Sequence, residues 1–157
     1  MMKRAIELAE EAASHDEVPV GAVVYDDEGR IYGEGYNLTH TTCDPTAHAE
    51  MVALRAAGKA MQSHYLHTLN LAVTIEPCAM CAQAMSWARI KQVVYGAEDV
   101  KSGGTDNGVK VFRSPNCHHK PQVMSGVDAD ACKALMQNFF KAKRLQKKKQ
   151  PDNKPHK

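Results

Sequence analysis

The sequence predicts an α/β fold, a three-layer sandwich in which helices cover both faces of one sheet. Two observations lead to this fold class. Stretches with apolar residues at helical spacing alternate along the chain with short apolar, β-branched runs, which is the order typical of layered α/β proteins. The chain has 157 residues, of which 43% are hydrophobic and 24% charged. That length and composition predict one globular domain with a buried core.

The first part of the chain is expected to form a helix and then a β-hairpin. Residues 2–14 carry apolar side chains at helical spacing, with Glu and Lys between them. Residues 18–25 and 30–37 flank an Asp-Asp-Glu-Gly turn, which predicts two paired strands. Gly33 and Gly35 in the second strand indicate a close approach of another backbone or of a ligand.

Capping residues mark the start of a second helix. We expect Asp44 to be its N-cap and Pro45 its first position, with the helix ending near Gly58. The other expected elements, in order, are a buried strand at 68–75, a helix at 77–88, a strand at 90–95, a loop at 97–120, a short strand at 121–125 and a helix at 128–147. Loops as long as the one at 97–120 are often functional in compact domains.

Charge is distributed unevenly along the chain. The net charge is +2, yet residues 141–157 contain eight Lys or Arg and one Asp, a local charge of +7 that leaves −5 on the remainder. A basic end on an acidic body suggests a partner that carries phosphates. A solvated, partly disordered tail explains the same charges equally well. We expect the folded domain to span 1–147 and residues 148–157 to form a basic, disordered tail.

The sequence predicts a cytoplasmic protein without a membrane segment. No apolar run follows the charged N-terminus, so no secretion signal is expected. No uncharged stretch reaches the ~20 apolar residues that a membrane helix needs. The five cysteines are an odd number, which argues against a disulfide framework and favours reduced thiols.

Four side chains in two short motifs suggest a catalytic metal site. Cys78 and Cys81 are three residues apart at the expected start of a helix, so both can bind one ion. The helix dipole at this position favours thiolates. With His48 they make three zinc-type ligands, which leave a fourth tetrahedral position open for water. Glu50 is then a carboxylate placed to move protons. A Cys-x-x-Cys pair alone could instead be a redox pair.

The spacing of His48 and Glu50 does not establish this site. Taken separately, a histidine at a helix start is usually a core residue, and a glutamate two positions later is usually a surface charge. Helical periodicity places the two side chains about 200° apart. Both can face one site only if the first turn is irregular, or if His48 reaches back while Glu50 reaches in.

The two motifs together resemble a known family. His-x-Glu followed by Pro-Cys-x-x-Cys is the pattern of zinc-dependent base deaminases. The longer sequences at residues 44–51 and 76–81 resemble those of the bacterial tRNA-specific adenosine deaminases, as do residues 18–23, 33–37 and 89–99. The resemblance covers roughly residues 2–147.

This resemblance implies a fold, a cofactor and a reaction. The fold is the three-layer α/β/α sandwich of the cytidine deaminase type, with a mixed five-stranded sheet. His48, Cys78 and Cys81 are expected to hold one Zn²⁺ per subunit, and Glu50 to transfer protons. The implied reaction is hydrolytic deamination of adenosine to inosine at the wobble position of tRNA anticodons, with a zinc-activated water as the nucleophile.

The resemblance also implies substrate contacts and partners. Asn37 matches a residue that hydrogen-bonds the flipped base, and Asp99 matches a position near the RNA backbone. Lys141, Lys143 and Arg144 on the last helix fit phosphate contacts. The expected partners are a tRNA anticodon stem-loop and a second copy of the chain in a homodimer.

Other functions remain open at this point. A free-base or nucleotide deaminase of the same superfamily, such as a guanine deaminase, shares a very similar first motif, although a free base has no phosphates for a basic helix to bind. A zinc-stabilised RNA-binding module without catalysis needs no Glu50. The run Cys117–His119 could suggest a second metal site, but it lacks a fourth ligand at a usual spacing. Trp87 is interpreted as a packing residue, with base stacking as the alternative.

Overall fold

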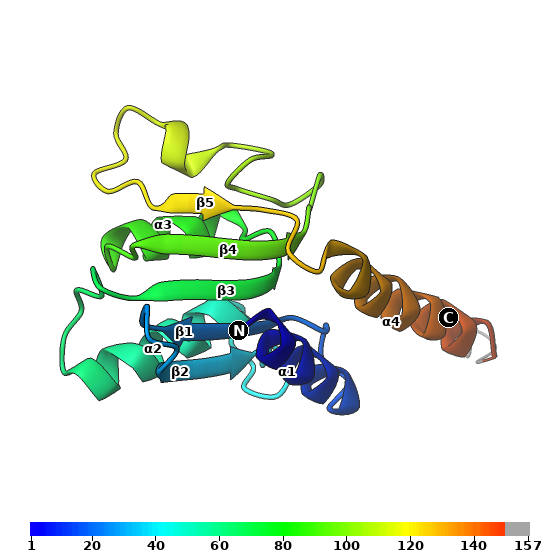
Figure 1. Cartoon of the computed structure of the whole chain (residues 1–157). Coiled ribbons are helices and arrows are strands. Elements are labelled where there is room, and N and C mark those ends of the chain that lie inside the picture. Colours follow the sequence, from blue (N-terminus) through cyan, green and yellow to red (C-terminus); the bar gives the residue numbers. More distant parts are fainter. Residues whose placement is uncertain (150–157) are drawn as a thin grey trace, which may run out of the picture.

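The computed structural model describes residues 1–149 and contains one five-stranded sheet with helices on both faces (Figure 1). The elements, in order, are α1 (Met2–Ser14), β1 (Gly21–Tyr25), β2 (Ile31–Tyr36), α2 (Ala49–Met61), β3 (Asn70–Ile75), α3 (Ala79–Trp87), β4 (Gln92–Ala97), the 3₁₀ turn η1 (Val111–Arg113), β5 (Gln122–Met124) and α4 (Ala129–Lys149). The expected number, order and type of the helices and strands are confirmed, and their ends shift by a few residues.

The sheet is mixed, as expected, with strand order β2-β1-β3-β4-β5. β1 runs antiparallel to both β2 and β3, while β3, β4 and β5 are parallel to one another. The β1–β2 hairpin closes through Asp26, whose side chain accepts the backbone N–H groups of Glu28 and Arg30. Parallel neighbours need a crossover, and α3 supplies it between β3 and β4.

Two apolar clusters, one on each face of the sheet, make the three layers. Leu71 and Val73 of β3 pack in the cluster that includes α2 and α3. Ala72, between them in the sequence, packs in the cluster formed with α1 and α4. This alternation is what a strand with both faces buried requires. The predicted three-layer α/β/α sandwich is therefore confirmed (Figure 1).

Two glycines of β2 let helix α2 lie directly against the strand. A Cβ atom on Gly33 would stand 2.3 Å from the carbonyl oxygen of Ala53, and one on Gly35 would stand 2.5 Å from that of Ala49. Neither position has room for a side chain, so the predicted close backbone approach is confirmed. The contact at Ala49 fixes the start of α2, where His48 and Glu50 lie.

The predicted start of the second helix is wrong. The helix begins at Ala49 with His48 as its N-cap, and Asp44 lies in the preceding turn. The reason is local, because the Asp44 carboxylate accepts the backbone N–H of Thr46 at 2.8 Å and its hydroxyl at 2.7 Å. These bonds close an Asx turn around Pro45 and delay the helix.

Two other helix boundaries bear on the site and on the expected tail. α3 begins at Ala79, not at Pro77, with Cys78 as its N-cap. α4 continues through Lys149, two residues beyond the expected end. Residues 150–157 lie outside the described residues, so the disordered basic tail stays a prediction. Across residues 1–149, none of the helices has the length and apolar character that a membrane span requires.

Candidate metal centre and active site

One imidazole and two thiols converge near the C-terminal end of β3, the central strand of the sheet. The Nδ1 atom of His48 lies 3.6 Å from the Sγ atom of Cys78 and 3.6 Å from that of Cys81. The three ligand atoms all lie within 4.8 Å of one another. Within residues 1–149 this is the one group of three or more His, Cys, Asp or Glu side chains that could hold a metal ion.

Helix starts explain how these three residues meet. His48 and Cys78 are the N-caps of α2 and α3, and both have extended backbones, with ψ near 154° and 171°. His48 is therefore not part of the helix, which resolves the conflict between its position and that of Glu50 in the first helical turn. The positive ends of both helix dipoles point at the cluster, where they favour thiolates.

The interaction between Cys78 and Cys81 shifts the pKa values of the two thiols in opposite directions. The pKa of Cys78 is lowered to about 4, mainly because the Cys81 thiol donates to it and also because His48 does. The pKa of Cys81 is raised, because its proton is held in the bond to Cys78 and because the thiol is buried. A metal ion binds thiolates, so a metal bound here would displace any proton held by these two thiols.

The donor set fits zinc. A tetrahedral site with Zn–N of about 2.0 Å and Zn–S of about 2.3 Å has nitrogen–sulfur edges of about 3.5 Å, close to the separations observed here. One nitrogen and two sulfur ligands suit this ion. Three protein ligands are typical of catalytic zinc sites, which keep one position open.

Glu50 supplies a buried carboxyl group beside the cluster. It lies in the first turn of α2 with only 3% of its surface exposed. Burial raises its pKa to about 7; the charge of Cys78 acts in the same direction, while the backbone N–H of Glu50 itself and the charge of His48 oppose it. A carboxyl group that changes protonation near neutral pH is suited to general acid–base catalysis.

A pocket of about 230 Å³ opens over the cluster and contains most of the predicted site residues. Its volume lies below the roughly 300–1,000 Å³ of drug-sized sites, which suits a single ring system. Its lining residues are Val18, Val20, Asn37, His48, Glu50, Ile75, Glu76, Cys78, Asp99, Ser102 and Met136. The structure therefore brings His48, Glu50, Cys78, Asn37 and Asp99 together at one cavity.

Asn37 is held in this pocket by a buried carboxylate. Its Nδ2 atom donates to the Glu17 carboxylate at 3.4 Å and to the Thr39 hydroxyl at 3.3 Å, so both contacts are made by the NH₂ end of the amide. Burial of Glu17 would raise its pKa, but hydrogen bonds, led by the backbone N–H of Thr41, outweigh burial and lower it. The sequence carries no motif that singles out Glu17.

Asp99 lies at the rim of the pocket and shapes the loop that follows β4. Its carboxylate accepts the backbone N–H groups of Lys101 at 3.1 Å and Ser102 at 2.9 Å. Its own backbone N–H donates to Glu76 at 3.1 Å. Ser102 lines the same pocket, so Asp99 fixes a second lining residue.

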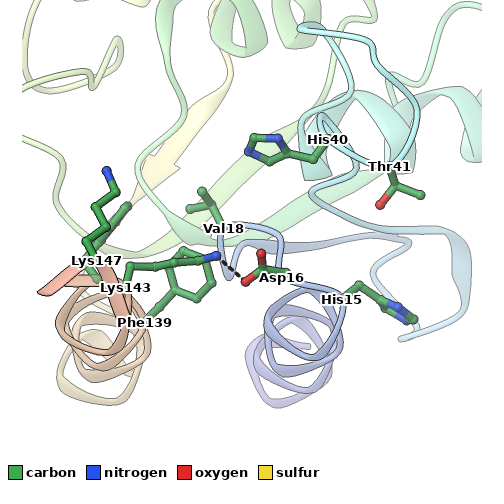
Figure 2. Close-up of a pocket in the computed structure, with 9 residues that line it drawn as sticks. His15, Asp16, Val18, His40, Thr41, Phe139, Lys143 and Lys147 are labelled. Atoms are coloured by element: carbon green, nitrogen blue, oxygen red, sulfur yellow. Dashed lines mark ion pairs between the residues drawn. The ribbon is translucent and has the colours of Figure 1, made fainter. Parts of the chain in front are cut away.

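A basic and aromatic groove of about 570 Å³ lies next to the pocket, and Val18 lines both (Figure 2). It is formed by the end of α1, the loop after β2 and helix α4. Its lining residues are His15, Asp16, Val18, His40, Thr41, Phe139, Phe140, Lys143 and Lys147. Lys143 forms an ion pair with Asp16 across the groove (Figure 2).

The predicted phosphate-binding residues do not share one surface. Lys143 lines the groove, whereas Lys141 and Arg144 are exposed and line neither the groove nor the pocket. The sequence interpretation overlooked Lys147, which lies one helical turn after Lys143. Lys147 could have been predicted from its spacing, because Phe139, Lys143 and Lys147 are four residues apart and such residues share a helix face.

The run Cys117–His119 forms a structural contact. His119 Nε2 lies 2.6 Å from the carbonyl oxygen of Ile90, and the buried Cys117 thiol lies 3.3 Å from the Ser86 hydroxyl. The interpretation of Trp87 as a packing residue is wrong for the single chain, because 70% of its surface is exposed. It ends α3 at the rim of a surface groove, where no element of residues 1–149 covers it.

The fold and the cluster define the class of protein, a zinc-binding deaminase domain. The family model of the cytidine and deoxycytidylate deaminase zinc-binding region matches residues 1–97, which include the His/Cys/Cys cluster and Glu50. The tRNA-specific adenosine deaminase of Haemophilus influenzae is 45% identical, over 94% of this chain and 86% of the relative. The chain therefore belongs to the cytidine and deoxycytidylate deaminase family, and within it to the tRNA-specific adenosine deaminases.

Solved structures agree with this placement. A structure from a study of A-to-I editing by tRNA:A34 deaminases has a TM-score of 0.83 and 42% identity, over 85% of this chain and 96% of that chain. A guanine deaminase from Bacillus subtilis is also similar, with a TM-score of 0.60 and 32% identity, over 99% of this chain and 95% of that chain. Both identity and structural agreement are greater for the tRNA deaminase.

We expect Cys81→Ala to abolish zinc binding. It removes one of three ligand atoms and leaves two, too few for a tight site. Metal analysis of the purified protein should fall from about one zinc ion per chain to a small fraction of that. Cys43→Ala is the matched control, because this thiol is exposed and outside the cluster. Full zinc content in the Cys81 variant would contradict the assignment.

Proposed function

We propose that this chain deaminates the wobble adenosine of tRNA anticodons to inosine. The observation that carries the proposal is the pocket itself, where a buried carboxyl group lies beside a zinc-type cluster in a cavity sized for one base. The relative from Haemophilus influenzae, described as a tRNA-specific adenosine deaminase, supports the choice of substrate.

The residues of the pocket divide the chemistry between them. His48, Cys78 and Cys81 hold the metal ion. When bound, Zn²⁺ supplies a Lewis acid that lowers the pKa of a water molecule toward neutrality and makes it a nucleophile. Glu50 takes one proton from the attacking water through a carboxylate oxygen and delivers it to a ring nitrogen. It then takes the proton of the new hydroxyl group on the attacked carbon and delivers it to the amine, which departs as ammonia. The buried position of Glu50 keeps this carboxyl group away from competing solvent protons.

Asn37 and Asp99 orient the substrate. Asn37 presents its amide to the base, and its contact with Glu17 holds the amide in one orientation. Asp99 lies at the pocket rim, where the ribose and backbone of a flipped nucleotide would pass. A pocket of this size excludes a base stacked in a helix, so a nucleic-acid substrate must offer an unpaired nucleotide that can turn out of its loop, as in an anticodon stem-loop.

Helix α4 provides the phosphate contacts. The groove beside the pocket combines Phe139 and Phe140 with Lys143 and Lys147, which suits stacking of bases and neutralisation of phosphates. Lys141 and Arg144, exposed on the same helix, extend the positive charge outward. RNA would compete with Asp16 for Lys143, because these two residues are paired in the free chain.

A second copy of the chain covers the face formed by α2 and α3. An apolar groove of about 680 Å³ lies there, and its lining includes Met51, Leu54, Leu66 and Trp87. Trp87 is 70% exposed, and an exposed apolar patch of this kind typically marks a protein interface. A symmetric dimer would bury the same patch on both subunits.

Replacement of Glu50 by Ala tests the reaction. Wild-type protein incubated with unmodified tRNA that carries a wobble adenosine should produce inosine, measured by mass spectrometry, and Glu50→Ala should lower kcat by roughly 10²–10⁴-fold with zinc content unchanged. Free guanine is assayed in parallel. Xanthine from guanine without inosine from tRNA would indicate the guanine deaminase reaction, and no product from either substrate would favour a binding module.

Charge reversal on α4 tests the RNA contacts. Lys147→Glu should raise KM for tRNA, leave kcat nearly unchanged, and reduce the log–log salt dependence of binding by roughly 0.7–1. Lys120→Glu, an exposed lysine just before β5, is the control with matched charge change. The same assay on Lys141→Glu and Arg144→Glu tests the outer face of the helix. If all four variants showed the same salt dependence of binding, the proposed contacts between α4 and the RNA phosphates would be contradicted.

Replacement of Trp87 by Glu tests the dimer. The buried charge would disrupt the proposed interface, so sedimentation should show a monomer where the wild type is a dimer. Val109→Glu is the control, because Val109 is 69% exposed and does not line the groove. A dimeric Trp87 variant would place the interface elsewhere.

A further inference from the structure

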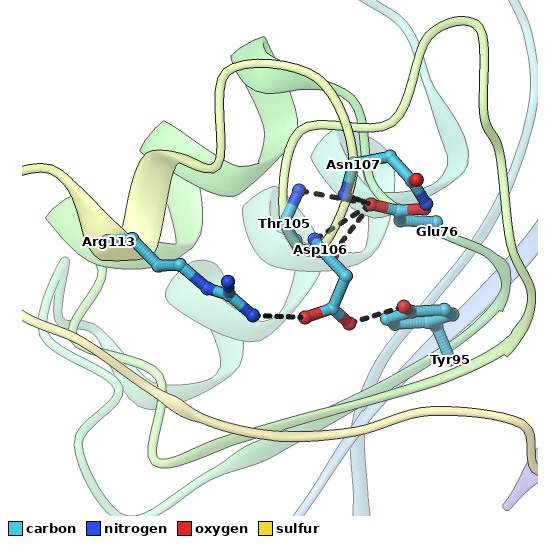
Figure 3. A network of polar contacts seen from close by, with 6 residues as sticks. All are labelled: Glu76, Tyr95, Thr105, Asp106, Asn107 and Arg113. Carbon is cyan, nitrogen blue, oxygen red and sulfur yellow. Dashed lines mark hydrogen bonds and ion pairs between the residues drawn. The ribbon is translucent and has the colours of Figure 1, made fainter.

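Glu76 is a buried carboxylate that the proposed chemistry does not use. It follows β3 directly and is 2% exposed. Figure 3 shows its carboxylate at the centre of a polar network formed by the loop after β4. The Oε1 atom accepts three successive backbone N–H groups, from Thr105 at 3.3 Å, Asp106 at 2.9 Å and Asn107 at 2.8 Å. It also accepts the Thr105 hydroxyl at 3.1 Å. The Oε2 atom accepts the backbone N–H of Asp99 at 3.1 Å and the side-chain amide of Asn107 at 2.7 Å.

All six partners are donors, and all come from residues 99–107. Successive backbone N–H groups that surround an anion form a stable binding concavity, here for a side chain of the same protein. Six donors around one buried carboxylate satisfy its oxygens and stabilise its charged form. The carboxylate therefore acts as a fixed charge around which the loop folds.

The loop that Glu76 holds forms one wall of the pocket. Asp99 and Ser102 line the cavity directly. Gly103 forms an isolated β-bridge with the metal-ligand candidate Cys78, and a Cβ atom on Gly103 would stand 2.5 Å from the Glu76 carboxyl carbon. At Gly103 the loop therefore lies directly against both the Glu76 carboxylate and Cys78, and this position has no room for a side chain.

A second set of contacts ties the same loop to the sheet. The Asp106 carboxylate accepts the hydroxyl of the buried Tyr95 on β4 and lies 3.6 Å from the Arg113 guanidinium (Figure 3). Asp106 also donates its backbone N–H to Glu76. The loop is therefore held by two sets of contacts, one to Glu76 and one to Tyr95 and Arg113. Of these three residues, Glu76 lines the pocket.

We propose that Glu76 is a positioning residue for the substrate, whose carboxylate holds residues 99–107 in the form that completes the pocket wall. This role rests on the proposed function for its substrate, although the loop contacts stand without it. Because Asp99 and Ser102 line the pocket where the substrate binds while Glu50 transfers the protons, Glu76 controls KM and not kcat.

The variant Glu76→Gln tests this role with little change in shape. Its NH₂ group cannot accept, so it faces backbone N–H donors whichever way the amide is turned. KM for the tRNA substrate should rise about 10- to 100-fold, with kcat within about threefold of wild type and zinc content unchanged. Hydrogen exchange followed by NMR should show faster exchange at the amides of residues 99 and 105–107. Glu98→Gln, an exposed carboxylate at the start of the same loop, should match wild type.

A second variant covers the case in which Glu76→Gln does not fold. Asn107→Asp changes a half-exposed residue outside the pocket and places a carboxylate 2.7 Å from Oε2, so it should raise KM in the same direction. An unchanged KM despite faster exchange in the loop would overturn the proposal. So would a loss of activity that follows a loss of zinc. If wild-type protein formed no inosine, the proposed function would fail, while the exchange data would still decide whether Glu76 holds the loop.

Discussion

The site depends on one constraint, the convergence of two helix N-termini near the C-terminal end of β3. His48 and Cys78 have extended backbones at the N-cap positions of α2 and α3, so their side chains reach back toward each other before either helix begins. The first turns then add Cys81 from one helix and Glu50 from the other. Both dipoles favour negative charge at this point, which two thiolates and a metal site require.

Backbone contacts elsewhere keep these helix starts in place. α2 can approach β2 closely only because Gly33 and Gly35 have no side chains, and the contact at Ala49 lies one residue after His48. The loop after β4 approaches from the other side, where Gly104 donates its backbone N–H to Pro77 at 2.8 Å. The metal ligands are thus fixed by segments that carry none of the chemistry themselves.

These constraints explain what could be predicted from the sequence and what could not. Helix α1 was predicted to the residue, and the mixed sheet, the layers and the His48, Cys78, Cys81 group followed from periodicity and a recognised pattern. The Asp44 N-cap was wrong because a side chain closed a local turn that competes with a helix. Glu17 and Glu76 were assigned no role because their partners lie 20 or more residues away in the sequence. Glu76 belongs to the recognised motif at 76–81, but that motif does not reveal its long-range contacts.

Glu50 and Glu76 line the same pocket and expose almost no surface, yet their pKa values shift in opposite directions. The difference lies in the depth at which each carboxyl group is buried and in the donors around it. Glu76 receives six hydrogen bonds, which stabilise its charge more than burial destabilises it, so its pKa is lowered. Burial dominates at Glu50, and its pKa rises to about 7. A permanently charged carboxylate can organise a loop but cannot exchange protons near neutral pH, and a carboxyl group that titrates there would be a poor anchor. The pocket thus needs both, and the surrounding backbone assigns each its role.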